Sequence, residues 1–333
     1  MKRNVFILLA FVTVWVTGCN RNTTKTDIVS VDPLPSWNET SPRHAIITFV
    51  DKAVTKDSPG FIPVADRIAV FDNDGTLWCE QPLYFEMTYG IAATRQIASE
   101  NPELQKKPEI NALVKGDMTT FFKSGEKGIL ETFVLSHTAV SPSQFDNMAA
   151  AWLDTAKHAR FNQSYSKLTY QPMVELLEYL RANDFKTYIV SGGSNQFIRL
   201  FSDDAYGIPA EQVVGTMLKA TYTEKDYSVS IKPELWHMND GAGKPEAIFQ
   251  VIGKRPVLAF GNSDGDLQML QYTSANTLPS LCLYLHHTDS IREYAYDRTS
   301  DIGRLDKGLD EAVQKKWVVV DMKNDFKKIF AFE

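Results

Sequence analysis

The sequence predicts an α/β protein with a doubly wound parallel sheet and an inserted, mainly helical domain. Three observations lead to this prediction. Short apolar runs alternate with helical patterns through most of the chain, which favours a parallel sheet covered on both faces. Residues 83–167 form a block of about 85 residues with helical periods and no convincing strand. Polar clusters rich in Asp, Gly and Ser follow three of the strand-like runs, at the edge of a parallel sheet where ligands bind.

The predicted elements follow the chain in a simple order. The strand-like runs are 67–71, 187–190, 257–260, 281–285 and 317–320. Helical patterns lie at 173–183, 196–201, 245–252 and 266–272, and a helix begins at the Ser-Pro pair 41–42. Residues 213–231 indicate a β-hairpin, and the charged, aromatic stretch 292–298 indicates a solvated helix. We therefore expect a core made of residues 41–82 and 168–333, with residues 83–167 as a helical cap.

The composition excludes several classes of protein. The 333 residues are 44% hydrophobic and 23% charged, which is ordinary for a globular chain and excludes a disordered or collagenous one. A net charge of −6 argues against a broadly basic nucleic-acid binder, and we expect no nucleic-acid partner. Three cysteines are too few for a disulfide framework, and Cys79 and Cys282 are expected to be free, buried thiols. The adjacent histidines at 286 and 287 favour a core or surface role over joint zinc binding.

The N-terminus has the pattern of an export signal. Lys2 and Arg3 precede an uncharged apolar run at 5–16, which is short for a membrane span, and small residues then precede Cys19. The pattern resembles a bacterial lipoprotein signal; a plain secretory signal or a short anchor is the alternative. The resemblance implies removal of residues 1–18, which lowers the net charge from −6 to −8 by removing two bases, and a lipid on Cys19. It also implies anchoring to a bacterial membrane, facing the periplasm or the cell exterior, through a polar tether at 19–40.

The most informative motif follows the first predicted strand. Asp72 and Asp74 are one residue apart, and Gly75 permits a sharp turn beneath them. Two carboxylates so close are costly unless a cation or a proton relieves them, and Mg²⁺ is the usual cation of an oxygen-only site. One carboxylate can attack phosphorus while the other moves a proton. The alternative is a surface turn, because Asn-Asp-Gly is also good turn sequence.

Three further motifs occur in the same half of the chain. Ser191, Gly192 and Gly193 follow the second strand and offer a hydroxyl and N–H groups to an anion. Lys244 opens another helix and has the charge to neutralise a phosphate. After the 257–260 strand, the segment 261–266 carries the possible metal ligands Asn262, Asp264 and Asp266. Taken singly, each could be an ordinary turn or a solvated charge.

Together, these four motifs resemble the haloacid dehalogenase-like superfamily of phosphotransferases, over residues of about 65–80 and 168–275. The resemblance implies a Rossmann-like core in which Asp72 is the nucleophile and a Mg²⁺ ligand. It implies that Asp74 is the general acid/base and offers its carbonyl to Mg²⁺, and that Ser191 and Lys244 hold phosphoryl oxygens. Asn262 stands where the family usually has Asp, so whether Asn262, Asp264 or Asp266 binds the metal stays open. Asp74 also argues against dehalogenation, since the dehalogenases lack this second acid.

The Ser-Gly-Gly motif and the position of the cap resemble the phosphoserine-phosphatase-like branch. In that branch a glutamate after the first motif contacts the substrate. Glu80 lies one residue short of this spacing and is otherwise a solvated or hinge-region carboxylate, the alternative that we slightly favour. The aromatic stretch 78–84 is expected to line the cap entrance.

The predicted function is Mg²⁺-dependent hydrolysis of a phosphomonoester, a small exported phosphorylated metabolite, through an aspartyl-phosphate. Two alternatives share the fold: a phosphotransferase, or a phosphonate hydrolase with a catalytic cap lysine such as Lys106, Lys107 or Lys115. A third is a non-catalytic binding lipoprotein. The sequence leaves the substrate and the oligomeric state open.

Overall fold

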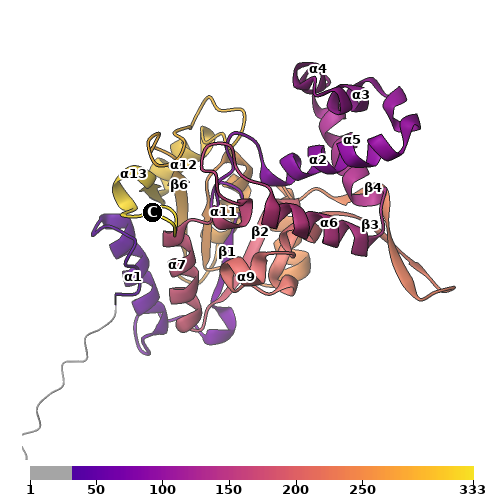
Figure 1. Ribbon diagram of the computed structural model, residues 1–333. Helices are drawn as coiled ribbons and strands as arrows, with labels where there is room; N and C mark the ends of the chain where they lie inside the picture. Colours follow the sequence, from indigo (N-terminus) through magenta and orange to yellow (C-terminus); the bar gives the residue numbers. More distant parts are fainter. Residues whose placement is uncertain (1–31) are drawn as a thin grey trace, which may run out of the picture. The chain divides into compact units, whose positions relative to one another are not determined.

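A seven-stranded sheet forms the centre of the structure, a computed structural model that describes residues 32–333 except for the side chain of Glu126 (Figure 1). The strand order is β4-β3-β2-β1-β5-β6-β7, and every neighbouring pair is parallel except β3 and β4. The strand β1 lies between β2 and β5, so the carboxyl ends of these three strands meet at one edge of the sheet. The predicted fold class, a doubly wound α/β sheet, is confirmed.

The elements have the following bounds. The strands are β1 (Ile68–Phe71), β2 (Lys186–Ser194), β3 (Val213–Thr223), β4 (Ser228–His237), β5 (Leu258–Gly261), β6 (Leu281–His286) and β7 (Val318–Asp321). The α-helices are α1 (Ser41–Val54), α2 (Phe85–Glu100), α3 (Pro108–Lys115), α4 (Met118–Lys123), α5 (Glu126–Thr138), α6 (Pro142–Thr155), α7 (Gln171–Ala182), α8 (Asn195–Ile198), α9 (Ser202–Tyr206), α10 (Gly243–Ala247), α11 (Leu267–Ser274), α12 (Lys307–Lys315) and α13 (Met322–Asp325). Short 3₁₀ or π turns lie at Val64–Asp66, Pro102–Lys106, Tyr165–Lys167, Ala210–Gln212, Ile248–Ile252 and Asp264–Asp266.

Both faces of the sheet are covered, because successive strand residues point to opposite sides. On β1, Ala69 and Phe71 join the core cluster that contains α1 and α7. Ile68 and Val70 join a second cluster, to which α10, α11 and α12 contribute apolar residues. All four residues of β1 are buried, as expected for a central strand of a parallel sheet.

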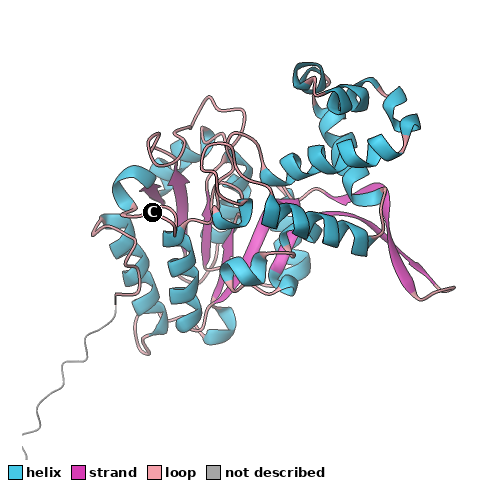
Figure 2. Cartoon of the chain, in the orientation of Figure 1, coloured by secondary structure: helices cyan, strands magenta, loops and turns pink. Residues whose placement is uncertain are grey.

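Helices α2–α6 lie between β1 and β2 in the sequence, and they form the predicted helical segment (Figure 2). Local signals explain several of their ends. Ser141 forms a capping box with Gln144 at the start of α6, and Gly116 ends α3 in the left-handed conformation. The small helix α4 lacked a clear period and was not predicted. The helices α2 and α5 pack closely where Gly90 lies against Thr132.

The predicted hairpin is longer than expected and partly belongs to the sheet. The first residues of β3 pair in parallel with β2, and the remainder of β3 pairs with β4 in a two-stranded arm that projects from the sheet (Figure 1). The strand β4 also contacts α5 of the helical segment. The arm therefore brings residues of β4 to the region between the sheet and the helices.

Two predictions at the ends of the core are wrong. Residues 292–298 form turns and an isolated bridge instead of a solvated helix, and Glu293 within them is fully buried. The tether was expected to reach residue 40, but Pro33–Glu333 forms one compact unit. Leu34 and Trp37 are buried in its core, and Ser36 donates hydrogen bonds to Glu175.

The predicted signal peptide and Cys19 lie outside the described residues. Among residues 32–333, none of the helices has the length and apolar character that a membrane crossing requires. Cys79 and Cys282 are buried and are not joined by a disulfide, as predicted.

Candidate active site

Asp72 lies directly after β1, where its backbone N–H donates to the Phe260 carbonyl of β5. Its side chain is buried, and Lys244 Nζ donates to its Oδ1 at 2.7 Å. The same ammonium donates to Asp266 Oδ1 at 2.5 Å. Burial raises the pKa of Asp72 well above its usual range, with Asp266 and Asp74 adding to the rise and Lys244 opposing it. The structure thus brings together three of the predicted residues, which lie far apart in the sequence.

Lys244 is itself buried near the start of α10. Burial alone would lower the pKa of this ammonium, but Asp266 and Asp72 together raise it above its ordinary value. The lysine is therefore a fixed positive charge between two carboxylates, and it holds Asp72 in one orientation.

Asp74 is positioned by the turn that follows Asp72. Trp78 Nε1 donates to its Oδ1 at 2.8 Å, and Gly75 between them has a φ of 70°. A Cβ atom at residue 75 would meet Asn262 Nδ2 at 2.1 Å, so this close approach requires glycine. Burial raises the pKa of Asp74 to about 6, with a smaller contribution from the negative charge of Glu86. A carboxyl group with that pKa can both release and accept a proton near neutral pH.

Glu80 lies beside this turn and is only 2% exposed, so of the two alternatives that we favoured, a solvated or a hinge-region carboxylate, the solvated one is wrong. Its Oε1 accepts hydrogen bonds of 2.7 Å from Asn262 Nδ2 and from the Tyr296 hydroxyl. Burial raises its pKa well above the usual range, and the charges of Asp74 and Asp72 add to the rise. Glu80 therefore anchors Asn262 and adds a further acid to the centre.

The 261–266 segment separates its three candidate ligands. Asn262 Oδ1 accepts from Thr76, next to the Asp72 turn. Asp266 points inward: its Oδ1 accepts from Lys244, and its Oδ2 accepts from the backbone N–H groups of Asn262 and Ser263.

Asp264 has a different set of partners. Its two carboxylate oxygens accept from the backbone N–H groups of residues 306–308, at the start of α12. Our expectation that Asp264 is a candidate metal ligand is therefore corrected to a role in capping a helix.

The second motif lies at the end of β2, which runs four residues further than predicted. Ser191 is fully buried, and its Oγ accepts from the N–H of Gly193 at 3.0 Å. Gly192 and Gly193 line the cavity that contains Asp72. The predicted helix after this motif is shorter than expected and consists of α8, capped by the Ser194 hydroxyl.

A cluster that was not predicted joins the cap helices to this motif. Glu86 of α2 accepts from the Ser194 N–H at 2.7 Å and from the Ser194 hydroxyl at 2.5 Å. His137 of α5 lies 3.0 Å from the same hydroxyl and 3.2 Å from Glu86. In the sequence, Glu86 and His137 stand in helical stretches without a motif, so only their tertiary neighbours reveal them.

A second unpredicted cluster contacts the backbone of the turn that follows Asp72. His287 is buried, and its Nε2–H donates to the Gly75 carbonyl at 2.7 Å. Its Nδ1 lies 3.1 Å from Glu293, which also accepts from Cys79 Sγ at 2.9 Å. The histidine therefore has the predicted core role, and the loop that was expected to be a helix supplies its partner.

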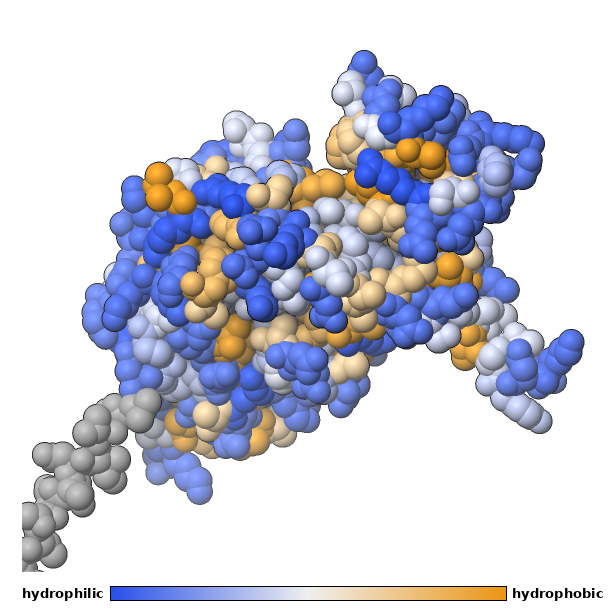
Figure 3. All heavy atoms as spheres, viewed as in Figure 1, coloured by the Kyte–Doolittle hydropathy of each residue, from blue (hydrophilic) through white to orange (hydrophobic). Residues whose placement is uncertain are grey.

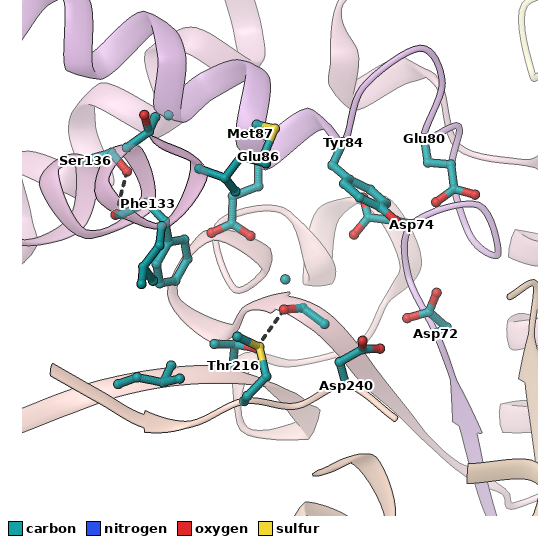
Figure 4. Close-up of a pocket in the computed structure, with 18 of the residues that line it drawn as sticks. Asp72, Asp74, Glu80, Tyr84, Glu86, Met87, Phe133, Ser136, Thr216 and Asp240 are labelled. Atoms are coloured by element: carbon teal, nitrogen blue, oxygen red, sulfur yellow. Dashed lines mark hydrogen bonds between the residues drawn. The ribbon is translucent and has the colours of Figure 1, made fainter. Parts of the chain in front are cut away.

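A cavity of about 860 Å³ opens beside Asp72, Asp74 and Lys244. Figure 4 shows the acids Asp72, Asp74 and Asp240 at one end and Phe133 at the other, with Glu86 and Met87 between them. From the stretch 78–84, Glu80 and Tyr84 line the cavity, whereas Trp78 is buried and stacks on Phe201. The cap lysine that lines it is Lys127, whose ammonium pairs with Glu109; Lys106 and Lys107 instead pair with Glu103 and Glu131.

The donor set at the charged end suits a hard cation. Asp72, Asp266 and Glu80 are buried beside the half-buried Asp74, Lys244 supplies a single positive charge against these four carboxyl groups, and all candidate donors are oxygens. Among the described residues, no three His, Cys, Asp or Glu side chains form a ready metal-binding group. Carboxylate and amide oxygens are ligands that Mg²⁺ takes in proteins, so this donor set fits Mg²⁺.

Comparison with known families agrees with this geometry. The sequence model described as haloacid dehalogenase-like hydrolase matches residues 69–271, more than half of the chain. The chain belongs to this family. The matched region of this hydrolase begins in β1 and ends in α11, so it includes all four motifs and the helical segment. A sequence comparison with curated proteins finds no match.

Several solved structures are similar to this hydrolase. A conserved, functionally unknown protein from Anaerococcus prevotii DSM 20548 is similar with a TM-score of 0.55 at 18% identity, over 76% of this chain and 87% of that one. A phosphoserine phosphohydrolase-like protein from Francisella tularensis has a TM-score of 0.34 at 19% identity, over 66% and 87% of the two chains. At 18% identity, the first similarity shows the fold.

Proposed function

We propose that this hydrolase is a Mg²⁺-dependent phosphomonoesterase that works through an aspartyl-phosphate on Asp72. One observation carries the proposal. The buried carboxylate of Asp72 is held by Lys244 at the end of the cavity that also contains Asp74, whose pKa is about 6. A nucleophile, a fixed positive charge and a proton donor therefore share one site.

In the first step, an Asp72 oxygen attacks phosphorus and the bond from phosphorus to the leaving oxygen breaks. Asp74, in its protonated form, donates a proton to that oxygen, so the product leaves as a neutral alcohol. In the second step, water attacks the phosphorus of the aspartyl-phosphate, and Asp74 accepts the proton of this water. Phosphate leaves, and Asp72 returns to its carboxylate form.

The remaining residues stabilise charge on the phosphoryl oxygens. The ammonium of Lys244 offers a fixed donor, and the Ser191 hydroxyl holds the turn at Gly192 and Gly193 by accepting from the Gly193 N–H. Asp72, the Asp74 carbonyl and the Asn262 amide oxygen would hold Mg²⁺, with Asp266 orienting both Lys244 and the 261–266 segment. The cation supplies additional positive charge against the phosphoryl oxygens when it is bound.

The test is phosphate release from methyl phosphate and from a generic aryl phosphate, with Mg²⁺ and with EDTA. Asp72→Asn is expected to lower kcat by at least about 10⁴-fold, because the amide is not a nucleophile. Asp66→Asn is the matched control, since Asp66 pairs with the surface residue Lys254, and it should leave kcat unchanged. Activity that survives Asp72→Asn, or that EDTA leaves unaffected, contradicts the mechanism.

We also propose that the protein is exported and lipid-anchored through Cys19, and that it acts on a small phosphorylated metabolite outside the cytoplasm. The support is the N-terminal sequence pattern. Labelled palmitate should be incorporated into the full chain and lost in Cys19→Ser. Equal labelling of both proteins would contradict the anchor.

A further inference from the structure

The cavity extends well beyond the residues that handle phosphate. Its far end is lined mainly by apolar side chains from three separate elements: Met87 of α2, Ile129, Leu130 and Phe133 of α5, and Leu235 and Met238 in and after β4. The volume of about 860 Å³ lies in the upper part of the range of about 300–1,000 Å³ that holds drug-sized ligands.

Several of these apolar side chains are open to solvent. Leu130 is 50% exposed, Leu235 is 41% exposed and Met238 is 51% exposed, although all three face the same cavity. Figure 3 shows apolar residues at the surface where the helical segment meets the sheet. A ligand that covers clustered apolar surface of this kind removes it from water, which favours binding.

Several polar groups at the same end already have partners within the protein, whereas the buried hydroxyl of Thr132 on α5 has none. The Ser136 hydroxyl donates to the Phe133 carbonyl, and the Thr216 hydroxyl donates to the Gly192 carbonyl. Glu86 accepts two hydrogen bonds from Ser194. A leaving group rich in hydroxyl, carboxyl or ammonium groups would therefore find few unengaged partners there.

We propose that the substrate of this site is the phosphomonoester of an apolar alcohol, whose alkyl or aryl body lies between α5 and β4 while its phosphate lies at Asp72. This inference rests on the proposed function and narrows its substrate class. The apolar body is assigned to the substrate because a single continuous cavity contains both the candidate nucleophile and the apolar residues.

The test uses a series of n-alkyl phosphates from methyl to octyl. From butyl onward the alcohol leaving groups have nearly the same reactivity, so any change in kcat/KM reports how well the alkyl chain of the substrate is bound. We expect kcat/KM to rise about two- to fourfold per methylene until the cavity is filled. Glycerol phosphate and phosphoserine should be poorer substrates than octyl phosphate.

Two variants on different elements locate the effect. Leu130→Asn and Leu235→Asn should each lower the ratio of octyl to methyl kcat/KM about fivefold to tenfold. Val313→Asn is the matched control, since Val313 is a helical residue with 78% exposure that does not line the cavity. This control should leave the ratio unchanged.

Calorimetric binding of the same series to Asp72→Asn separates this inference from the proposed function. Tighter binding of octyl than of methyl phosphate, with a negative heat-capacity change, supports the apolar site even if no ester is hydrolysed; in that case only the proposed hydrolysis is wrong. Hydrolysis of methyl phosphate with no dependence of kcat/KM or binding on chain length overturns the inference and leaves the proposed function standing.

Discussion

The two ends of the cavity differ in the kind of side chain that lines them. At the sheet end, Asp72, Lys244 and Asp266 are buried and fixed by short hydrogen bonds, and burial raises the pKa of Asp72. At the helical end, Leu130 and Phe133 present apolar surface with few polar partners. The proposed function therefore assigns the reaction and the selection of substrate to different elements. Substitutions at the sheet end should change the rate with every substrate, and substitutions at the helical end should change the preference among substrates.

The largest effect is expected for Lys244→Ala. Loss of the ammonium leaves Asp72 and Asp266 as buried carboxylates without their shared partner. We expect kcat/KM to fall at least about 10³-fold with all esters alike, and the free energy of unfolding to fall by about 3–5 kcal/mol. Steady-state kinetics and urea unfolding measure both quantities.

Lys254→Ala is the control for this variant, because Lys254 pairs with Asp66 at the surface. It should change the unfolding free energy by less than about 1 kcal/mol. A Lys244→Ala effect confined to long-chain esters would break the division between the two ends.

The next effect is expected for Asp74→Asn, which removes the proton donor. We expect kcat with alkyl phosphates to fall about 10²- to 10³-fold. The loss should be smaller for aryl phosphates, because their leaving groups need less protonation. In the wild type, the rate with alkyl phosphates should show an inflection near the Asp74 pKa of about 6 and decline above it, as the acid loses its proton. An equal loss for alkyl and aryl esters would contradict the assignment.

The same variant should be more stable than the wild type. The pKa of Asp74 is raised from 3.8 to about 6 by burial, so its ionisation destabilises the folded protein. The penalty is absent below about pH 4, grows between pH 4 and 6, and is complete above pH 6. In EDTA at pH 7.5, Asp74→Asn should raise the unfolding free energy by about 1–2 kcal/mol, and the gain should vanish towards pH 4. A loss of stability at pH 7.5 would contradict the assigned environment.

A smaller effect tests the division within one motif. Asp264→Ala removes the acceptor for the N–H groups that begin α12, and it should lower the unfolding free energy by about 0.5–2 kcal/mol. The kcat should stay within about threefold of the wild-type value, because Asp264 accepts from backbone N–H groups of α12 and does not contact Lys244. A tenfold rise in the Mg²⁺ concentration needed for half-maximal activity would return Asp264 to the metal site.

The smallest effect concerns the link between the two ends. Ser194→Ala removes the hydroxyl that contacts Glu86 and His137, while the Ser194 N–H still donates to Glu86. We expect KM to rise about two- to fivefold with little change in kcat. Ser274→Ala is the control, because the Ser274 hydroxyl donates to the Gln271 carbonyl within α11. A large fall in kcat would mean that this cluster belongs to the reacting end.

The sheet end could largely be predicted from the sequence, and the helical end could not. Asp72 and Asp266 follow β1 and β5, and Ser191 lies near the end of β2; these neighbouring parallel strands end at the same edge of the sheet. Lys244 required the family resemblance, since a lone lysine at a helix start has no distinctive pattern. The directions of Asp264 and Asp266 depend on the geometry of one 3₁₀ turn, which residue types alone do not specify.

The helical end depends on tertiary packing. Leu130 and Leu235 belong to elements about 100 residues apart, and their meeting is set by how α5 contacts β4. The buried role of Glu80 arises from Asn262 and Tyr296, which are distant in the sequence. The charges of the stretch 292–298 indicate a solvated helix, but Glu293 is buried and contacts His287 and Cys79.

The identity of the nucleophile is the central claim, and trapping the intermediate tests it most directly. Rapid acid quenching during turnover of octyl phosphate should yield phosphorylated protein, which borohydride reduces at the modified aspartate. Peptide mass spectrometry should then find the reduced residue at position 72 and nowhere else. Modification at another residue, or turnover at the full rate without any trapped phosphoprotein, would contradict the account.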